Sequence, residues 1–404
     1  MMDNKVIVSG IGVVSALGVG VNENLNSLMT LKSGIAPITL FETNHDVMVG
    51  EVKLDNMEMI EMLCLDTSKR YSRTALLGLI AAREAYSDSG FILLSQHDRI
   101  RLKIGVISST SVGGMDVSEN FYKEYRLDKS KGRLRDLIGH DCGSSTKIIA
   151  DYLKADDFVS TVSTACSSAS NAIMLGTRMI KNGLLDVAVV GGTDSLSRFT
   201  VNGFYSLGIL DKEQCRPFDE TRAGLNIGEG AGYLIIQRSD IPHEKTYGEV
   251  CGYANANDAY HQTASSSDGT GAYLAMSGAL EVSGLYPEDI SIVHAHGTGT
   301  PNNDASEGSA LLRIFGNKVP LFSSTKSYTG HTLAAAGGVE SVFSLLSLKY
   351  GYVWPNLNFG VRMRDVDVMP VVQLVSGMDI KYVLKNSFGF GGNCTTLIFG
   401  YCNM

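Results

Sequence analysis

The sequence predicts an α/β fold, because short apolar runs alternate with longer segments in which apolar residues recur at helical spacing. Runs of this kind are typical of strands in a largely parallel sheet that helices cover on its faces. A chain of 404 residues that is 44% hydrophobic and 19% charged also has enough apolar material for a large core.

In the first half of the chain, strands and helices are expected to alternate. Apolar runs predict strands at residues 6–10, 104–108 and 187–191. Alanines and leucines at helical spacing predict helices at residues 72–89 and 169–181.

The second half repeats this style. The expected strands lie at residues 248–254, 291–294, 384–387 and 396–400. The expected helices lie at residues 273–283 and 334–349. A charged segment around Pro242 marks the break, and no low-complexity linker follows it. We therefore expect two halves, residues 1–243 and 244–404, that are fused into one body.

The charge and the cysteine content of the chain argue against several classes of protein. A net charge of −8 argues against general nucleic-acid binding, which needs a basic face. No run of ~18 apolar residues occurs, so no membrane span is expected. The seven cysteines are scattered and form no C-x-x-C pair. This pattern predicts reduced thiols in a cytoplasmic protein, with neither a disulfide framework nor a metal site.

One segment of this acidic chain, residues 122–135, is locally basic. Its cations are Lys123, Arg126, Lys129, Lys131, Arg133 and Arg135. Such a segment is either a solvated surface loop or a docking site for an acidic partner.

The segment STVSTACSSASN, residues 160–171, places Cys166 among small residues directly before a predicted helix. The helix end supplies unpaired N–H groups and a partial positive charge, which lower the pKa of a thiol. Small neighbours leave room for a substrate over the sulfur. Cys166 is therefore a candidate nucleophile, although a buried, inert thiol is the commoner role of a cysteine.

Two further segments carry candidate histidines. HAHGTGTPNND, residues 294–304, holds His296 in a glycine turn at a strand end, and Thr298 and Thr300 could line a polar channel there. In SSTKSYTGHTLAAAGGVE, residues 323–340, His331 precedes an alanine-rich helix, whose positive end disfavours the imidazolium. Lys326 and Glu340 could pair, or each could be an ordinary surface residue.

The last segment, NSFGFGGNC at residues 386–394, is a glycine-rich turn that can aim a backbone N–H at one point and hold Phe390 as a gate. It lacks the lysine and hydroxyl residue of a phosphate-binding loop.

In this order and spacing, the four segments resemble the elongating β-ketoacyl-acyl-carrier-protein synthases, types I and II, of the thiolase superfamily. The matching motifs are TACSS around Cys166, AHGTGTP around His296, KSYTGHTLAAAG from Lys326 through His331, and NSFGFGGN around Phe390. The resemblance spans nearly the whole chain. It implies a thiolase fold: two similar α/β halves with five-stranded mixed sheets, in five α-β-α-β-α layers. The nucleophile would lie in the first half and both histidines in the second.

The resemblance also implies roles for single residues. Cys166 would be the nucleophile, His296 and His331 the paired histidines, and Lys326 and Glu340 the supporting ion pair. The backbone N–H groups of Cys166 and Phe390 would form the oxyanion hole.

Other positions would support or bind the substrate. Asp304 and Glu307 fall at buried acidic positions beside the active site, and Val112 falls where the depth of the acyl pocket is limited. Thr298, Thr300 and Phe390 would contact substrate and phosphopantetheine.

The implied reaction is a decarboxylating condensation of an acyl group with malonyl-acyl carrier protein, in fatty acid, polyene or polyketide synthesis. It needs no metal or organic cofactor, because phosphopantetheine arrives on the carrier protein. The implied partners are acyl carrier protein and a second subunit, either an identical chain or a homologue without the cysteine. Residues 195–211 and 222–225 depart from the family's usual sequence pattern. They are more similar to synthases of specialised pathways, such as those that make aryl polyenes. A partner-subunit role and an acyl hydrolase are the alternatives.

Overall fold

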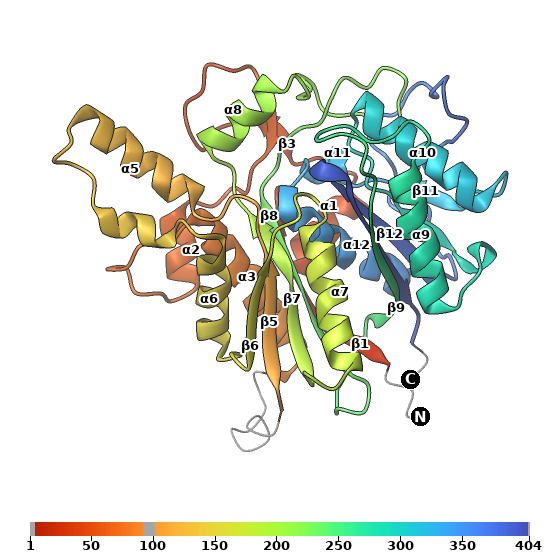
Figure 1. Ribbon diagram of the computed structural model, residues 1–404, viewed down its shortest axis with the longest axis horizontal. Coiled ribbons are helices and arrows are strands. Elements are labelled where there is room, and N and C mark those ends of the chain that lie inside the picture. The colour runs from red at the N-terminus through yellow and green to blue at the C-terminus, as the bar shows by residue number, and fades with distance from the viewer. Residues whose placement is uncertain (1–4, 92–101, 403–404) are drawn as a thin grey trace.

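The computed structural model of the chain describes residues 5–91 and 102–402. Two five-stranded runs, joined edge to edge, form its main sheet (Figure 1). The first run has the order β6-β5-β7-β8-β1. Its strands are β1 (Val6–Ser15), β5 (Ile104–Ser109), β6 (Phe158–Val162), β7 (Val187–Asp194) and β8 (Gly230–Arg238). A short strand, β2 (Gly18–Val19), pairs with β1.

The second run has the order β11-β10-β12-β13-β9. Its strands are β9 (Gly248–Asn257), β10 (Ile292–His294), β11 (Leu321–Ser323), β12 (Tyr382–Gly389) and β13 (Asn393–Gly400). The two runs meet where Ile7 pairs with Glu249 and Val8 with Gly248. The boundary after residue 243 stays a prediction, although the chain does cross between the runs from β8 to β9.

The strand directions repeat in the two runs. From the shared junction outward, each run has two antiparallel pairings followed by two parallel ones. The prediction of a largely parallel sheet is therefore wrong, and the mixed sheets that the family resemblance implied are confirmed. Apolar runs indicate that both faces of a strand are covered, but they do not indicate the direction of the strand.

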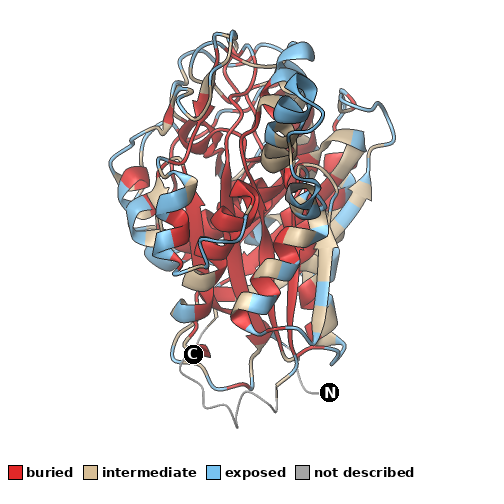
Figure 2. Cartoon of the chain, turned by 90° about the vertical axis from the view of Figure 1, so that its left-hand side faces the viewer, coloured by how far each residue is buried: buried red, intermediate tan, exposed pale blue. Residues whose placement is uncertain are grey.

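Helices complete the five layers. The outer layer on the first run holds α3 (Arg73–Asp88) and α6 (Cys142–Leu153), and that on the second run holds α9 (Thr270–Ser283) and α10 (Pro301–Phe315). Between the runs lie α7 (Ser168–Lys181) and α12 (Ala336–Tyr350), which contact strands of both. The sheet and the helix α12 between its runs are largely buried, whereas exposed residues lie on the outer elements (Figure 2).

The composition of α12 explains its central position. Residues 336–348 are all buried, so the helix is covered on every side. Two glycines allow the close approach: a Cβ on Gly337 would lie 2.6 Å from the Ser170 nitrogen, and one on Gly338 would lie 2.2 Å from the Gly232 oxygen. The small residues thus let α12 pack directly on α7 and β8.

The remaining elements lie around this body. They are α1 (Val21–Met29), β3 (Ile35–Pro37), β4 (Met48–Gly50), α2 (Asn56–Met62), α5 (Met115–Leu127), α8 (Arg198–Ser206), α11 (Lys326–Thr329) and the short 3₁₀ turns Leu134–Gly139, Pro287–Asp289, Leu333–Ala335 and Phe390–Gly392. In the described ranges, no helix is both long enough and apolar enough to cross a lipid bilayer.

Candidate active site

The four sequence motifs meet at one cavity of about 240 Å³ between the two halves. Six of the predicted site residues line it: Cys166, His296, Thr298, Thr300, His331 and Phe390. The other predicted residues lie behind its wall. Among the described residues, no group of three or more potential ligands is placed to hold a metal ion.

Cys166 lies at the start of α7, as predicted, one residue before the N-cap Ser167. The chain turns sharply there, because Ala165 has a left-handed φ of 53° and its carbonyl accepts from the Ser168 N–H at 3.1 Å. A strained residue next to a candidate nucleophile is common at functional sites. Cys166 is 6% exposed, and that exposure opens on the cavity.

The predicted lowering of the thiol pKa is wrong for the unliganded protein. Burial raises the pKa of Cys166 to about 11, although Lys326 and the Phe390 N–H act in the opposite direction. The reason is desolvation: a thiolate in a closed cavity loses more hydration than the helix end and one lysine restore. The sulfur therefore rests as a thiol.

Phe390 reaches Cys166 because Gly389 has no side chain. A Cβ on Gly389 would lie 3.1 Å from the Cys166 nitrogen and 2.8 Å from the Thr164 oxygen. The Phe390 N–H points at the Cys166 sulfur, and the Phe390 ring stacks on Phe204 of α8 with centroids 6.0 Å apart. This arrangement places two backbone N–H groups, of residues 166 and 390, next to the sulfur.

His296 and His331 lie edge to face across the cavity, with ring centroids 5.3 Å apart. Nδ1 of His296 faces Lys326 Nζ at 3.2 Å, and Nδ1 of His331 accepts from the Leu333 N–H at 3.2 Å. A ring nitrogen that accepts carries no hydrogen, so both neutral rings hold their proton on Nε2. Each ring thus has an N–H donor left for the cavity.

Both imidazoles are neutral. Burial and the positive charge of Lys326 lower the pKa of His331 to about 3, and burial with Lys326 and the other ring lowers the pKa of His296 well below its usual value. The neutral state of His331 agrees with the sequence prediction, but its cause differs. The ring precedes the 3₁₀ turn Leu333–Ala335 and not the start of a long helix. Burial and the nearby Lys326, and not a helix end, lower its pKa.

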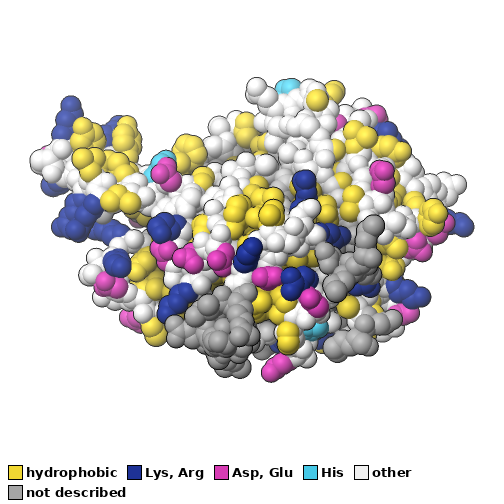
Figure 3. All heavy atoms as spheres, turned by 60° about the horizontal axis from the view of Figure 1, so that its bottom comes forward, with side chains coloured by type: hydrophobic (Ala, Val, Ile, Leu, Met, Phe, Trp, Pro, Cys, Tyr) yellow, Lys and Arg dark blue, Asp and Glu magenta, His cyan; other side chains and the backbone are white. Residues whose placement is uncertain are grey.

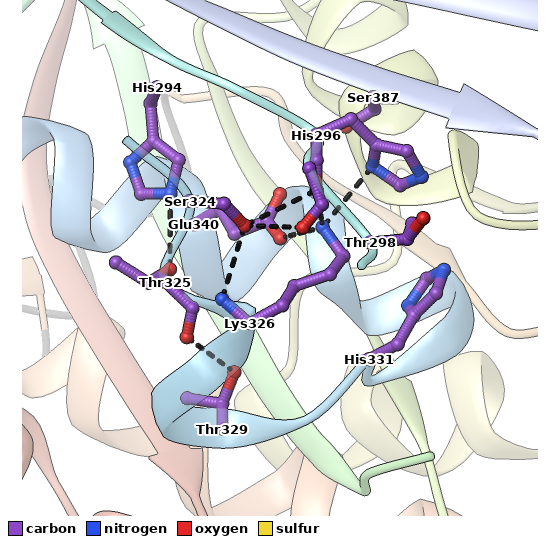
Figure 4. A network of polar contacts seen from close by, with 12 residues as sticks. His294, His296, Thr298, Ser324, Thr325, Lys326, Thr329, His331, Glu340 and Ser387 are labelled. Atoms are coloured by element: carbon purple, nitrogen blue, oxygen red, sulfur yellow. Dashed lines mark hydrogen bonds and ion pairs between the residues drawn. The ribbon is translucent and has the colours of Figure 1, made fainter. Parts of the chain in front are cut away.

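Lys326 and Glu340 form the predicted pair, and both are buried. Lys326 Nζ also donates to the His296 carbonyl, so it connects Glu340 to the histidine (Figure 4). A third histidine, His294, lies behind this group between Thr325 and Ser344 and does not line the cavity.

Asp304 and Glu307 of α10 fix the loop that carries His296. Glu307 accepts from the His296 and Gly297 N–H groups at 2.9 and 2.8 Å, and Asp304 accepts from the Thr298 N–H at 3.0 Å. Burial raises the pKa of Glu307 to about 7. Thr298 and Thr300, whose hydroxyls bond each other at 2.9 Å, both line the cavity.

Val112 does not line the cavity. It packs in an apolar cluster with Phe204 and Leu225, and these two side chains form part of the cavity wall. Its expected role in limiting the depth of the acyl pocket stays a prediction.

Two of the buried charged residues that the sequence analysis did not single out lie next to the predicted site. Asp194, at the end of β7, accepts from Ser111 Oγ and from the Ala334 N–H, and so joins the Val112 loop to the 3₁₀ turn that precedes α12. Lys385 of β12 contacts Glu340 at 3.1 Å. A charged residue within or at the end of an apolar strand run was the available signal in both cases.

The basic segment lies on an arm formed by α5 and the turn Leu134–Gly139, which projects from the body (Figure 1). All six cations are exposed, and no residue of α5 is buried. The arm also exposes Leu127, Leu134 and Ile138, which are 82%, 77% and 76% exposed. Figure 3 shows these two kinds of side chain together on the projecting part at the left.

Comparison with known proteins matches both halves of the chain to one family. Residues 3–240 match the N-terminal domain of beta-ketoacyl synthase and residues 247–360 its C-terminal domain. The chain is 32% identical to 3-oxoacyl-[acyl-carrier-protein] synthase 2 of Staphylococcus aureus, over 99% of both chains.

Two solved structures are also similar over nearly the full length. The ishigamide ketosynthase/chain length factor superimposes with a TM-score of 0.91 at 29% identity, over 99% of this chain and 100% of that one. A type II PKS ketosynthase, solved in complex with its acyl-carrier protein, gives a TM-score of 0.86 at 27% identity, with the same coverage. The chain therefore belongs to the beta-ketoacyl synthase family, whose members are acyltransferases that form carbon–carbon bonds between acyl thioesters.

Proposed function

We propose that this chain catalyses the decarboxylating condensation of an acyl group, held on Cys166, with malonyl-acyl carrier protein. One observation carries the assignment of roles. Two neutral imidazoles with Nε2–H donors share a cavity with a thiol that two backbone N–H groups flank. A thioester oxygen that gains negative charge needs donors of this kind.

In the first half-reaction, the Cys166 sulfur attacks the acyl thioester carbon. The N–H groups of Cys166 and Phe390 stabilise the oxyanion of the tetrahedral intermediate. The carbon–sulfur bond to the carrier then breaks, and the carrier leaves as a thiol with the proton that Cys166 gave up. An acyl-enzyme remains.

In the second half-reaction, the malonyl thioester oxygen binds the Nε2–H groups of His296 and His331. Loss of carbon dioxide leaves an enolate whose negative charge lies on that oxygen. The enolate carbon attacks the acyl-Cys166 carbonyl and expels the thiolate, which takes a proton from solvent. The reaction draws on decarboxylation for its driving force, so the proposal includes no metal and no organic cofactor.

The proposed partners are acyl carrier protein and a second subunit. The arm would recognise an acidic carrier, because all six of its cations are exposed. The similar structures, described as a ketosynthase/chain length factor and as a ketosynthase with its carrier, support both partners. All seven cysteines are free, which supports a reducing, cytoplasmic site of action.

A partner-subunit role without catalysis is the second candidate, since one similar structure pairs a ketosynthase with a chain length factor. The intact set of Cys166, His296 and His331 at one cavity favours the catalytic role.

The experiment is acyl transfer from acyl-carrier protein, followed by addition of malonyl-carrier protein and mass analysis of both proteins. We expect an acyl adduct on Cys166 and then a β-ketoacyl carrier two carbons longer. Cys166→Ala should form no adduct, and Cys215→Ala, which removes another buried thiol, should form it normally. Free acid without a β-keto product would identify a hydrolase, and no adduct on the wild type would favour the partner-subunit role.

A further inference from the structure

A second buried lysine, Lys385, lies behind the histidines, and the mechanism above does not use it. It is on β12 and is 0% exposed. Val383, two residues earlier, packs in the middle-layer core, so Lys385 faces α7 and α12 on the same side of the strand. A lysine side chain is almost never fully buried unless it is paired.

The partners of Lys385 come from three elements. Its Nζ lies 3.1 Å from Oε2 of Glu340 on α12 and 3.2 Å from Oγ of Ser170 on α7, and it also bonds Ser387 on its own strand. Ser170 is four residues after Cys166 on the helix that the nucleophile precedes.

Glu340 is thus held between two lysines. Lys326 contacts Oε1 and Lys385 contacts Oε2, so both carboxylate oxygens have a fixed cation. Lys326 in turn contacts Nδ1 and the carbonyl of His296. A chain of contacts therefore runs from Lys385 through Glu340 and Lys326 to the imidazole.

We propose that Lys385 is a positioning residue for the condensation. It fixes Glu340, and through it Lys326, so that His296 keeps its proton on Nε2. The inference rests on the function proposed above and extends it to a residue that does not touch the cavity.

The charges around Lys385 make this role dependent on pH. Glu340 of α12 and Glu307 of α10 favour its charged form, whereas Lys326 of α11 opposes it, and His294 of β10 and the two cavity histidines feel its charge. Burial outweighs the carboxylates and lowers the pKa of Lys385 to about 8. The ammonium is present below that pH and is lost as the pH rises through it, which leaves one oxygen of Glu340 without its cation.

The test is the rate of malonyl-carrier decarboxylation between about pH 6 and 9 for wild type, Lys385→Met and the control Lys381→Met. Lys381 is exposed and lies four residues before Lys385. For wild type and control we expect a decline above about pH 8. Lys385→Met should be at least about tenfold slower at pH 7 and should show no such decline.

Ser170→Ala is a second, milder variant, because it places no larger side chain in the core. It removes an acceptor from the ammonium, so the decline should move to lower pH. The proposal is overturned if Lys385→Met matches wild type, or if it is slower at every pH but its rate still declines above about pH 8. If Lys385→Met does not fold, the proposal is overturned when Ser170→Ala leaves the pH dependence of the rate unchanged. A wild type that decarboxylates nothing at any pH would instead contradict the proposed function.

Discussion

The Leu333 N–H donates to Nδ1 of His331 at 3.2 Å, and this bond leaves the imidazole proton on Nε2, toward the cavity. Lys326 sets the same tautomer in His296. We predict that His331→Ala or His296→Ala slows malonyl decarboxylation about 10²–10³-fold, the usual effect of losing one oxyanion donor.

Acylation of Cys166 should stay within about tenfold of wild type in both variants, because the Cys166 and Phe390 N–H groups serve that step. The two steps are measured separately, by carbon dioxide release and by adduct mass. Equal losses in both steps would mean that the histidines act on the thiol and not on the malonyl oxygen.

The thiol form of Cys166 predicts a simple pH dependence of its alkylation. Burial raises the pKa of Cys166 to about 11, and only the thiolate reacts. The rate of iodoacetamide modification should therefore rise about tenfold per pH unit from about pH 7 to 9.5, without a plateau. Modification is followed by mass spectrometry, with Cys166→Ala to subtract the other thiols. A plateau below about pH 8 would show that the sulfur is a thiolate at neutral pH.

The sequence alone predicted four helices and seven strands that the structure contains, but it did not predict β6, β8 and β11 of the main sheet or the outer helices α6 and α10. For the helix at 72–89 the structure has α3, capped by Ser72, and for 169–181 it has α7. Local signals suffice there, because apolar spacing and caps act within one element. The pattern predicted strand direction wrongly, because direction depends on connections between distant elements.

For the site, the sequence predicted which residues meet and that His331 is neutral, but it did not predict the charge state of Cys166. The state of Cys166 depends on how completely the cavity excludes water, which no local pattern records. Lys385 was missed because its role comes from Glu340 and Ser170, which are distant in sequence. Val112 does not line the cavity, although it packs on the same apolar cluster as Phe204, which does, and its role in limiting the acyl pocket stays a prediction.

The stack of Phe390 on Phe204 predicts a control on acyl length. The rings are 6.0 Å apart at an angle of 18°, and both line the cavity. Phe204→Ala removes about 0.5–1.5 kcal/mol of ring–ring interaction and widens the wall. We expect the ratio of kcat/KM for long over short acyl carriers to rise up to about tenfold. Phe199→Ala, an exposed residue of the same helix, is the control, and equal ratios in both variants would refute the role of the stack.

The arm predicts salt-sensitive carrier binding. Lys129→Glu with Arg133→Glu reverses two of six exposed cations. The affinity for acyl carrier protein should fall several-fold at low salt, and the difference from wild type should shrink as salt is raised, because exposed charges are screened. Titration calorimetry at two salt concentrations measures it. Unchanged affinity together with an altered oligomeric state would assign the arm, with its exposed leucines, to subunit pairing.

Glu340 predicts a stability difference that depends on pH. Burial raises the pKa of Glu340, but Lys326 and Lys385 outweigh burial and lower it to about 2. A carboxylate with a lowered folded-state pKa stabilises the protein above its unfolded value, near 4.5, and this contribution is lost as the pH falls toward 2. Glu340→Gln should therefore lower the free energy of unfolding at pH 7 by about 3–5 kcal/mol, the usual cost of breaking a buried pair.

The gap between the unfolding free energies of wild type and Glu340→Gln should shrink only below about pH 4.5. Urea unfolding at a series of pH values measures it. Glu281→Gln, on the exposed side of α9, should show no gap. A gap for Glu340→Gln that stays constant down to the acid limit of folding would mean that the carboxylate is already protonated at neutral pH, and that Lys326 contacts His296 without a charged partner.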